Sequence, residues 1–183
     1  MAAVRRIVVG VNGSLGSLQA LRYAADEARE RGVPLVPVIT WIPPGGDLAE
    51  RGRPSPYLRR VWREAASKQL LAAFDDGLGG MPADVHVEPR VARGETGPVL
   101  VDIAHKPGDL LVIGTGRRSF LRRALRKSVG RYLLAHATCP VMAVPPSALM
   151  NEMGRRGLPH RWWPLGSRRG GGVVPDLSEL SGK

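Results

Sequence analysis

A chain of 183 residues is long enough to form one domain with a sizeable hydrophobic core. Lys and Arg number 27 against 16 Asp and Glu, which gives a net charge of +11 and suits a phosphate, nucleic-acid or acidic membrane partner. Arg far outnumbers Lys, which GC-rich coding would also produce. Composition alone therefore leaves open whether the positive charge serves an anionic partner or only reflects codon usage. The single cysteine, Cys139, excludes an intramolecular disulfide and a Cys-based metal site, which fits a reducing compartment.

The opening residues MAAVRRIVVGVN lead directly into a strand pattern, with no separate apolar segment before a small-residue cleavage site. No apolar run approaches the roughly 20 residues that a membrane-spanning helix needs. We therefore expect a cytoplasmic protein without a membrane partner.

Strand-like and helix-like segments alternate along the chain. Apolar or alternating runs predict five strands, at 6–12, 33–41, 84–91, 110–113 and 141–144. Apolar residues at helical spacing predict four helices, at 17–31, 57–78, 98–106 and from near residue 128. This βαβαβαβαβ order predicts an α/β fold, with an open five-stranded parallel sheet and helices on both faces.

The sequence also predicts structural roles for individual residues within these elements. Pro37 lies inside the second strand, where it can donate no ladder bond, so we expect a bulge or a local edge there. Ser14 either caps the first helix or contacts a phosphate, and Gly32 closes that helix. The long second helix should bury a set of apolar side chains, namely Val61, Ala65, Leu70, Leu71 and Phe74.

The periodic pattern stops after Pro146. Residues 148–183 contain three consecutive glycines, two Arg pairs and little periodicity. We predict a folded body at 1–147 and a basic, Gly-rich, disordered tail at 148–183. The alternative is that Trp162 and Trp163 dock on the body or on a partner.

The stretch 109–145 carries the clearest functional signal. An apolar strand ends at Gly114, an Arg-rich loop follows, and a helix opens near Ser128. A helix start has unpaired N–H groups and a partial positive charge, so this arrangement favours an anion site. Seven basic residues and no acidic one lie in 117–131, namely Arg117, Arg118, Arg122, Arg123, Arg126, Lys127 and Arg131.

Three segments, IVVGVNGS, GDLLVIGTG and KSVGRYLLAHATCPVMAVP, resemble the universal stress protein family over residues 4–147. The resemblance implies a Rossmann-like sheet of strand order 3-2-1-4-5 and a homodimer formed through the last strand, Val141 to Val144. Many members of that family bind ATP through the pattern Gly-x2-Gly-x9-Gly followed by Ser or Thr. Glycines in such a loop let the backbone approach phosphate oxygens closely.

This sequence keeps only the ends of that pattern. Gly114 and Ser128 occupy its first and last positions, whereas Arg117 and Lys127 stand where glycines belong, and either block the phosphate cradle or bind phosphate directly. Asn12 replaces the family's Asp after the first strand, and its carbonyl oxygen can still accept a hydrogen bond. The resemblance thus implies a nucleotide site made of Asn12, Thr40, Ile113, Gly114, Arg117, Lys127, Ser128 and Val129.

The function that the sequence favours is a stress-response regulator that binds ATP at the switch point of the sheet without turning it over. One alternative is a stress protein that binds no nucleotide, and another is a polyanion or nucleic-acid binder that uses the Arg-rich loop. Single-strand binding is disfavoured because only Phe120 and Tyr132 lie near that loop. A nucleotide-cleaving enzyme ranks last, since no carboxylate or general base stands near Gly114 or Ser128. Scattered single histidines predict no metal site, and Cys139 is expected to be a small buried hydrophobe.

Overall fold

The computed structural model describes residues 3–46, 52, 54–115 and 129–145 of the chain. These ranges include all five predicted strands and the predicted helices at 17–31, 57–78 and 98–106. The last predicted helix is described from residue 129 onward. The predicted tail at 148–183 and most of the Arg-rich loop lie outside these ranges.

Strands and helices alternate as predicted. The strands are β1 (Arg6–Val11), β2 (Leu35–Trp41), β3 (Arg90–Arg93), β4 (Asp109–Gly114) and β5 (Val141–Val144). The helices are α1 (Leu15–Arg31), α3 (Pro56–Leu78), α4 (Thr96–Ile103) and α5 (Val129–His136).

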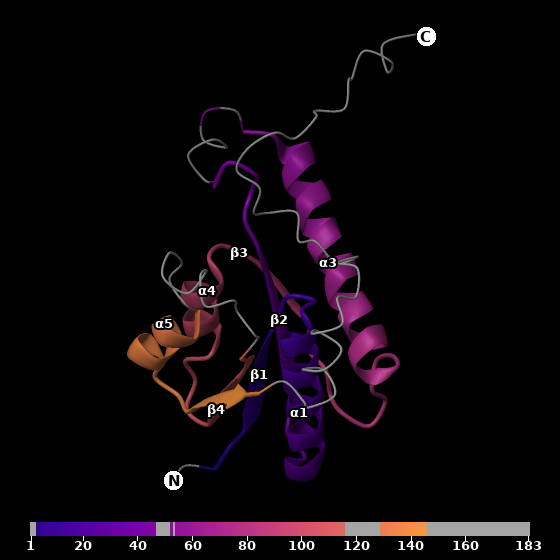
Figure 1. Cartoon of the computed structure of the whole chain (residues 1–183), viewed down its shortest axis with the longest axis vertical. Coiled ribbons are helices and arrows are strands. Elements are labelled where there is room, and N and C mark those ends of the chain that lie inside the picture. The colour runs from indigo at the N-terminus through magenta and orange to yellow at the C-terminus, as the bar shows by residue number, and fades with distance from the viewer. Residues whose placement is uncertain (1–2, 47–51, 53, 116–128, 146–183) are drawn as a thin grey trace, which may run out of the picture.

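The five strands form one parallel sheet in the order β3-β2-β1-β4-β5 (Figure 1). This order confirms the prediction. The chain runs outward from β1 to β3 on one side and then crosses back to β4 on the other. The reversal of direction between β1 and β4 defines the topological switch point of the sheet.

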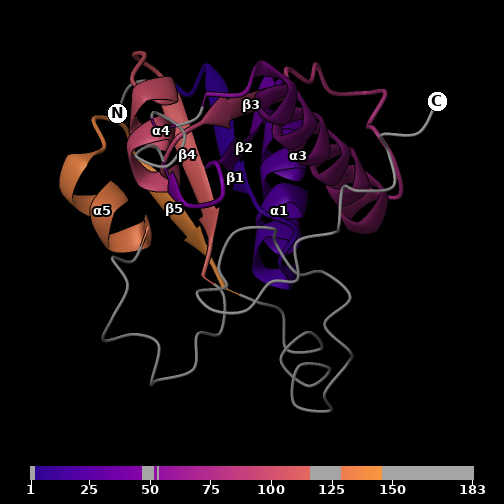
Figure 2. The ribbon, with the colours of Figure 1, turned by 90° about the horizontal axis from the view of Figure 1, so that it is seen from above.

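Helices cover both faces of the sheet, with α1 and α3 on one side and α4 and α5 on the other (Figure 2). The face under α1 and α3 is packed with side chains such as Leu21 and Phe74. The opposite face holds a second cluster around Leu100 and Leu133. Because both faces of the central strands are buried, β1 and β4 read as continuous apolar runs rather than as alternating ones.

Pro37 interrupts the ladder between β2 and β3 without a bulge. Leu35 bridges Val87 and Val38 pairs with Arg90, so the register is the same on both sides of the interruption. Leu35 donates to the His86 carbonyl and accepts from the Glu88 N–H, so the next donor of β2 toward β3 would be residue 37, and Pro37 has no N–H. The result is the local edge that the sequence predicts.

The same interruption explains an error in the predicted third strand. The sequence predicts a strand at 84–91, whereas β3 begins only at Arg90 and runs to Arg93. Before it, Val87 makes an isolated bridge to Leu35. Alternating apolar residues are therefore not enough for a strand where the neighbouring strand lacks the N–H that would continue the ladder.

The predicted buried face of the long helix is correct in part. Leu70 and Phe74 of α3 are buried, but Val61 and Leu71 are 38% and 53% exposed. Leu71 is turned away because it lies about 100° around the helix from Leu70. Val61 belongs to the first turns of α3, which extend past the described strands (Figure 1).

Candidate functional site

Asn12 directly follows β1 at the switch point. Its Oδ1 accepts hydrogen bonds from the Ser14 N–H (3.1 Å) and the Ser14 hydroxyl (2.7 Å). Its backbone N–H donates to Ser17 Oγ (3.3 Å), and its carbonyl oxygen accepts from Gln69 Nε2 (3.1 Å). A backbone N–H needs an acceptor, so the amide oxygen of Asn12 faces Ser14. The side-chain NH2 group is therefore the part of Asn12 available to a ligand.

Ser14 caps α1, as one of the two predictions for it stated. Its backbone is extended, and its hydroxyl accepts from the Ser17 N–H at 3.3 Å. Gly32 closes the helix with a φ of 62°, which confirms the second predicted cap. Contact of Ser14 with a phosphate stays a prediction.

Gly114, the last residue of β4, lies against the first turn of α1. A Cβ at this position would collide with the carbonyl oxygen of Gly16 and stand 2.9 Å from the backbone nitrogen of Ser17. Glycine is therefore required here by packing, because any side chain would collide with the α1 backbone. The sequence interpretation assigned this glycine only to phosphate approach.

Thr40 lies near the end of β2, level with Asn12. The last register pair of β1 and β2 joins Val11 to Ile39, so the next residues, Asn12 and Thr40, are neighbours on adjacent strands. The Thr40 hydroxyl hydrogen-bonds that of Thr96, the first residue of α4, at 2.8 Å. This contact ties the start of α4 to the carboxyl edge of the sheet.

Ile113 and Val129 flank the same edge from the α4 and α5 side. Ile113 is 8% exposed within β4, and Val129 is the first residue of α5. Both pack in the cluster around Leu100 and Leu133. Arg117, Lys127 and Ser128, the other three predicted ligands, lie outside the described residues.

The model of the universal stress protein family matches residues 3–145 of this chain. A universal stress protein of Mycolicibacterium smegmatis is 34% identical over 142 residues, which cover 76% of this chain and 45% of the relative. One of Mycobacterium bovis is 30% identical over 148 residues, covering 75% and 47%.

The chain belongs to the universal stress protein family. It spans about half the length of the curated relatives that it matches. Among solved structures, it resembles a universal stress protein in complex with cAMP, at 25% identity and a TM-score of 0.51. That match covers 80% of this chain and 100% of the other. The universal stress protein of Archaeoglobus fulgidus is 27% identical, with a TM-score of 0.51 and coverage of 76% and 98%.

Two residues of this universal stress protein reach the site although the sequence analysis did not single them out. Gln69 of α3 bonds the backbone of Asn12, and Thr96 bonds Thr40. Both contacts join residues more than 50 positions apart in the chain. Neither has a local sequence signal, because only the packing of α3 and α4 on the sheet creates them.

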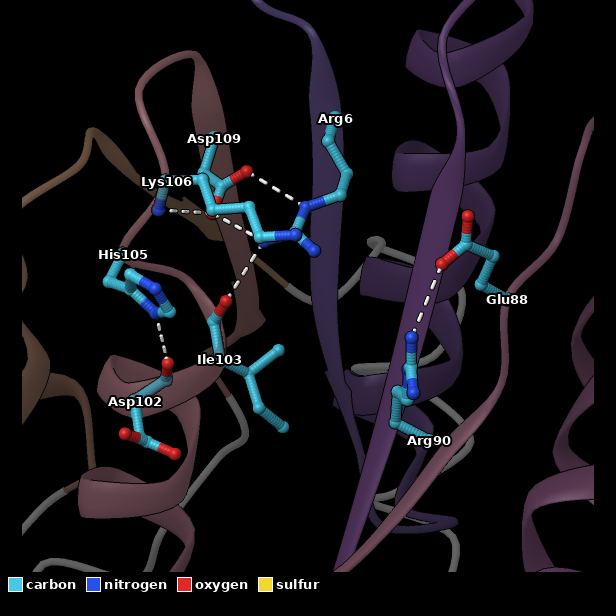
Figure 3. Close-up of polar contacts among 8 residues, drawn as sticks. All are labelled: Arg6, Glu88, Arg90, Asp102, Ile103, His105, Lys106 and Asp109. Atoms are coloured by element: carbon cyan, nitrogen blue, oxygen red, sulfur yellow. Dashed lines mark hydrogen bonds and ion pairs between the residues drawn. The ribbon is translucent and has the colours of Figure 1, made fainter.

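The opposite, amino-terminal edge of the sheet holds ion pairs (Figure 3). Arg6 bonds both carboxylate oxygens of Asp109, at 2.9 and 2.6 Å, and also the Ile103 carbonyl at 2.9 Å. The Lys106 N–H donates to the same carboxylate at 2.9 Å. Asp109 is 2% exposed, and its hydrogen bond raises the pKa of Arg6. These contacts fasten the start of β1 to the start of β4, and we assign them to stability.

The remaining candidates fit structural roles. Cys139 is half-buried beside the α4 and α5 cluster, and burial raises the pKa of its thiol, which lowers its reactivity at neutral pH. His136 stacks on Tyr132 at 4.1 Å between ring centroids and bonds the Tyr132 carbonyl. Within the described ranges, no group of His, Cys, Asp and Glu could hold a metal ion, and no helix is long and apolar enough to cross a membrane.

Proposed function

We propose that this universal stress protein binds an adenine nucleotide, ATP, at the carboxyl ends of β1 and β4, and that binding rather than turnover is its output in a cytoplasmic stress response. The observation that carries the proposal is the reversal of strand order between β1 and β4. In open α/β sheets ligands bind beyond the carboxyl ends of the strands at such a point. The similar structure in complex with cAMP supports an adenine nucleotide.

The proposed site has a polar and an apolar side. Asn12 and Thr40 supply side-chain amide and hydroxyl groups at the ends of β1 and β2, while Ile113 and Val129 supply apolar surface for a base. Gly114 lets the end of β4 pack against the first turn of α1. Ser128, which precedes Val129 in the sequence, and the cations Arg117 and Lys127 are the remaining proposed phosphate contacts.

Calorimetric titration with ATP, on protein stripped of bound nucleotide, tests this function at low and at physiological salt. Saturable binding that persists at physiological salt and prefers ATP to other triphosphates is the expected result. Binding that ignores the base and vanishes with salt would instead favour the alternative, a polyanion binder using the Arg-rich loop. Absence of binding at both salts would overturn the proposal.

A substitution of Lys127 tests whether a basic side chain at a glycine position of the family pattern strengthens or weakens ATP binding. If Lys127 holds phosphate, Lys127→Ala should weaken ATP binding by more than about 1 kcal/mol in the same titration. Arg90→Ala is the matched control, since Arg90 lies in β3, the far edge strand, and pairs with Glu88. Unchanged or tighter binding in Lys127→Ala would show that Lys127 obstructs the site or stays clear of it.

We further propose that the protein does not hydrolyse the nucleotide. Between residues 110 and 132 the sequence contains no Asp, Glu or His that could activate a water next to the phosphates. A phosphate-release assay with ATP should therefore give no signal above background. Sustained release that follows the protein concentration would contradict this.

A further inference from the structure

The first turns of α3 extend past the sheet (Figure 1). Gln69 of this helix bonds the backbone of Asn12, immediately after the end of β1. The helix begins at Pro56, so about 13 of its residues, or about 20 Å at 1.5 Å per residue, precede that contact. These turns stand beyond the carboxyl edge of β1.

The apolar stripe of α3 continues into these turns. Ala66 and Leu70 are buried on the sheet, and Trp62 and Leu58 extend this row toward the start of the helix at spacings of four residues, each step turning it by about 40° around the axis. Trp62 packs against Trp41 at the end of β2, with ring centroids 6.3 Å apart. Beyond that contact the stripe is open, since Leu58 is 41% exposed.

Two further apolar side chains widen this surface. Tyr57 is 66% exposed and Val61 is 38% exposed, each within one turn of Leu58. We call Tyr57, Leu58, Val61 and Trp62, together with Trp41, the overhang surface. Single exposed apolar residues are common, but a contiguous group on one helix indicates an interaction site.

The overhang surface is positively charged at its margin. Arg60 lies over the Tyr57 ring at 6.0 Å, and Arg93 lies over the Trp41 ring at 5.8 Å. Between residues 51 and 74 the sequence has one acidic residue, Glu64, which pairs with Arg60 at 3.8 Å. The same stretch contains five Arg and one Lys, so its charge is strongly unbalanced.

We propose that the overhang surface docks an amphipathic helix of a partner protein, whose apolar side meets Leu58 and Trp62 and whose acidic side meets the arginines. Tyr, Trp and Arg are the residue types that dominate protein interfaces, and helix recognition uses apolar anchors one turn apart. The same surface of a second copy fits poorly, because such a contact would bring the two sets of arginines together. Trp41 and Trp62 pack against one another, and Leu58 and Val61 offer a base no ring to stack on, so the surface suits a protein better than a single-stranded nucleic acid.

Fluorescence anisotropy with labelled synthetic peptides tests the proposal on the full chain. The probe is a peptide of about 18 residues, long enough to form a helix, with Leu and Phe on one side and Glu on the other. A scrambled peptide of the same composition and a labelled single-stranded oligonucleotide are the comparison probes. The variant is Leu58→Glu, and the control is Leu71→Glu, which places the same charge on the other side of α3.

We expect the amphipathic peptide to bind at physiological salt, and Leu58→Glu to weaken that binding by about tenfold or more while Leu71→Glu leaves it unchanged. Circular dichroism establishes that both variants are folded. Equal binding of the scrambled peptide, equal loss in the two variants, or no peptide binding would overturn the proposal. A loss of oligonucleotide binding in Leu58→Glu without an effect on the peptide would assign the surface to nucleic acid and would overturn it too.

Discussion

Gly114 has a packing role in addition to its proposed role in nucleotide binding. The carbonyl oxygen of Gly16 occupies the space that a Cβ at Gly114 would need. The glycine at the end of β4 therefore lets this strand touch the backbone of the first turn of α1. This places the start of α1 at the switch point, beside the proposed nucleotide.

Gly114→Ala should lower the free energy of unfolding by about 1 to 3 kcal/mol, because the methyl group must push α1 and β4 apart. Urea denaturation measures the change. Gly77→Ala is the matched control, since a Cβ there meets Leu21 Cδ2 at an ordinary 3.5 Å and alanine favours the helix. A Gly114→Ala protein that is as stable as the parent but has lost ATP binding would show that the glycine serves the phosphate alone.

Asn12 has a single side-chain oxygen, and Ser14 already donates to it twice. An Asp at this position would keep these bonds and offer a second oxygen to a nucleotide hydroxyl or amine. Asn12→Asp should therefore tighten ATP binding by about 1.5 kcal/mol, the scale of a hydrogen bond to a charged group, in calorimetric titration. Weaker binding would indicate that the Asn12 NH2 group donates to the ligand and that the added charge repels it.

At the scale of elements, the ion pair of Arg6 and Asp109 fixes how β1 meets β4. The two residues are register partners on adjacent strands, and the carboxylate is nearly fully buried. The pair lies at the amino-terminal edge, so it sets the alignment of the strands whose far ends form the switch point.

Asp109→Asn should lower the free energy of unfolding by about 3 kcal/mol, because the Arg6 guanidinium loses its buried counter-charge. Thermal or urea denaturation measures the loss. Glu64→Gln is the control: its pair with Arg60 is more than 60% exposed on both sides, so the expected cost is below about 0.5 kcal/mol. Equal small losses in the two variants would contradict a structural role for the buried pair.

At the scale of the whole molecule, β5 forms an edge of the described sheet. Met142 is 39% exposed on this strand, and Leu134 of the neighbouring helix α5 is 76% exposed. An exposed strand edge with apolar side chains pairs readily with another chain. The homodimer through Val141 to Val144 stays a prediction that these exposures support.

Met142→Glu should shift the protein from dimer to monomer, because a symmetric contact would bring two like charges together. Light scattering coupled to size exclusion measures the mass at matched concentrations. Leu71→Glu, on the remote helix α3, should leave the mass unchanged. If the parent protein has the mass of a monomer, or if Met142→Glu keeps the mass of a dimer, the proposed interface is wrong.

Local patterns in the sequence predict the element order, the parallel sheet and the Gly32 cap of α1, and they leave the Ser14 cap as one of two alternatives, because hydrophobic periodicity, Gly and Ser act locally along the chain. The sequence also located Asn12 and Gly114 at strand ends, since an apolar run ends where the strand does. These features depend on neighbouring residues alone.

Tertiary structure decided what depends on distant residues. Pro37 shortened β3 only because the register directs the position of its missing N–H toward that strand. The carbonyl of Gly16 gave Gly114 its packing role, and Gln69 reached Asn12 across 57 positions. Such contacts arise when helices pack on the sheet, and no local pattern encodes them because each partner looks ordinary in its own segment.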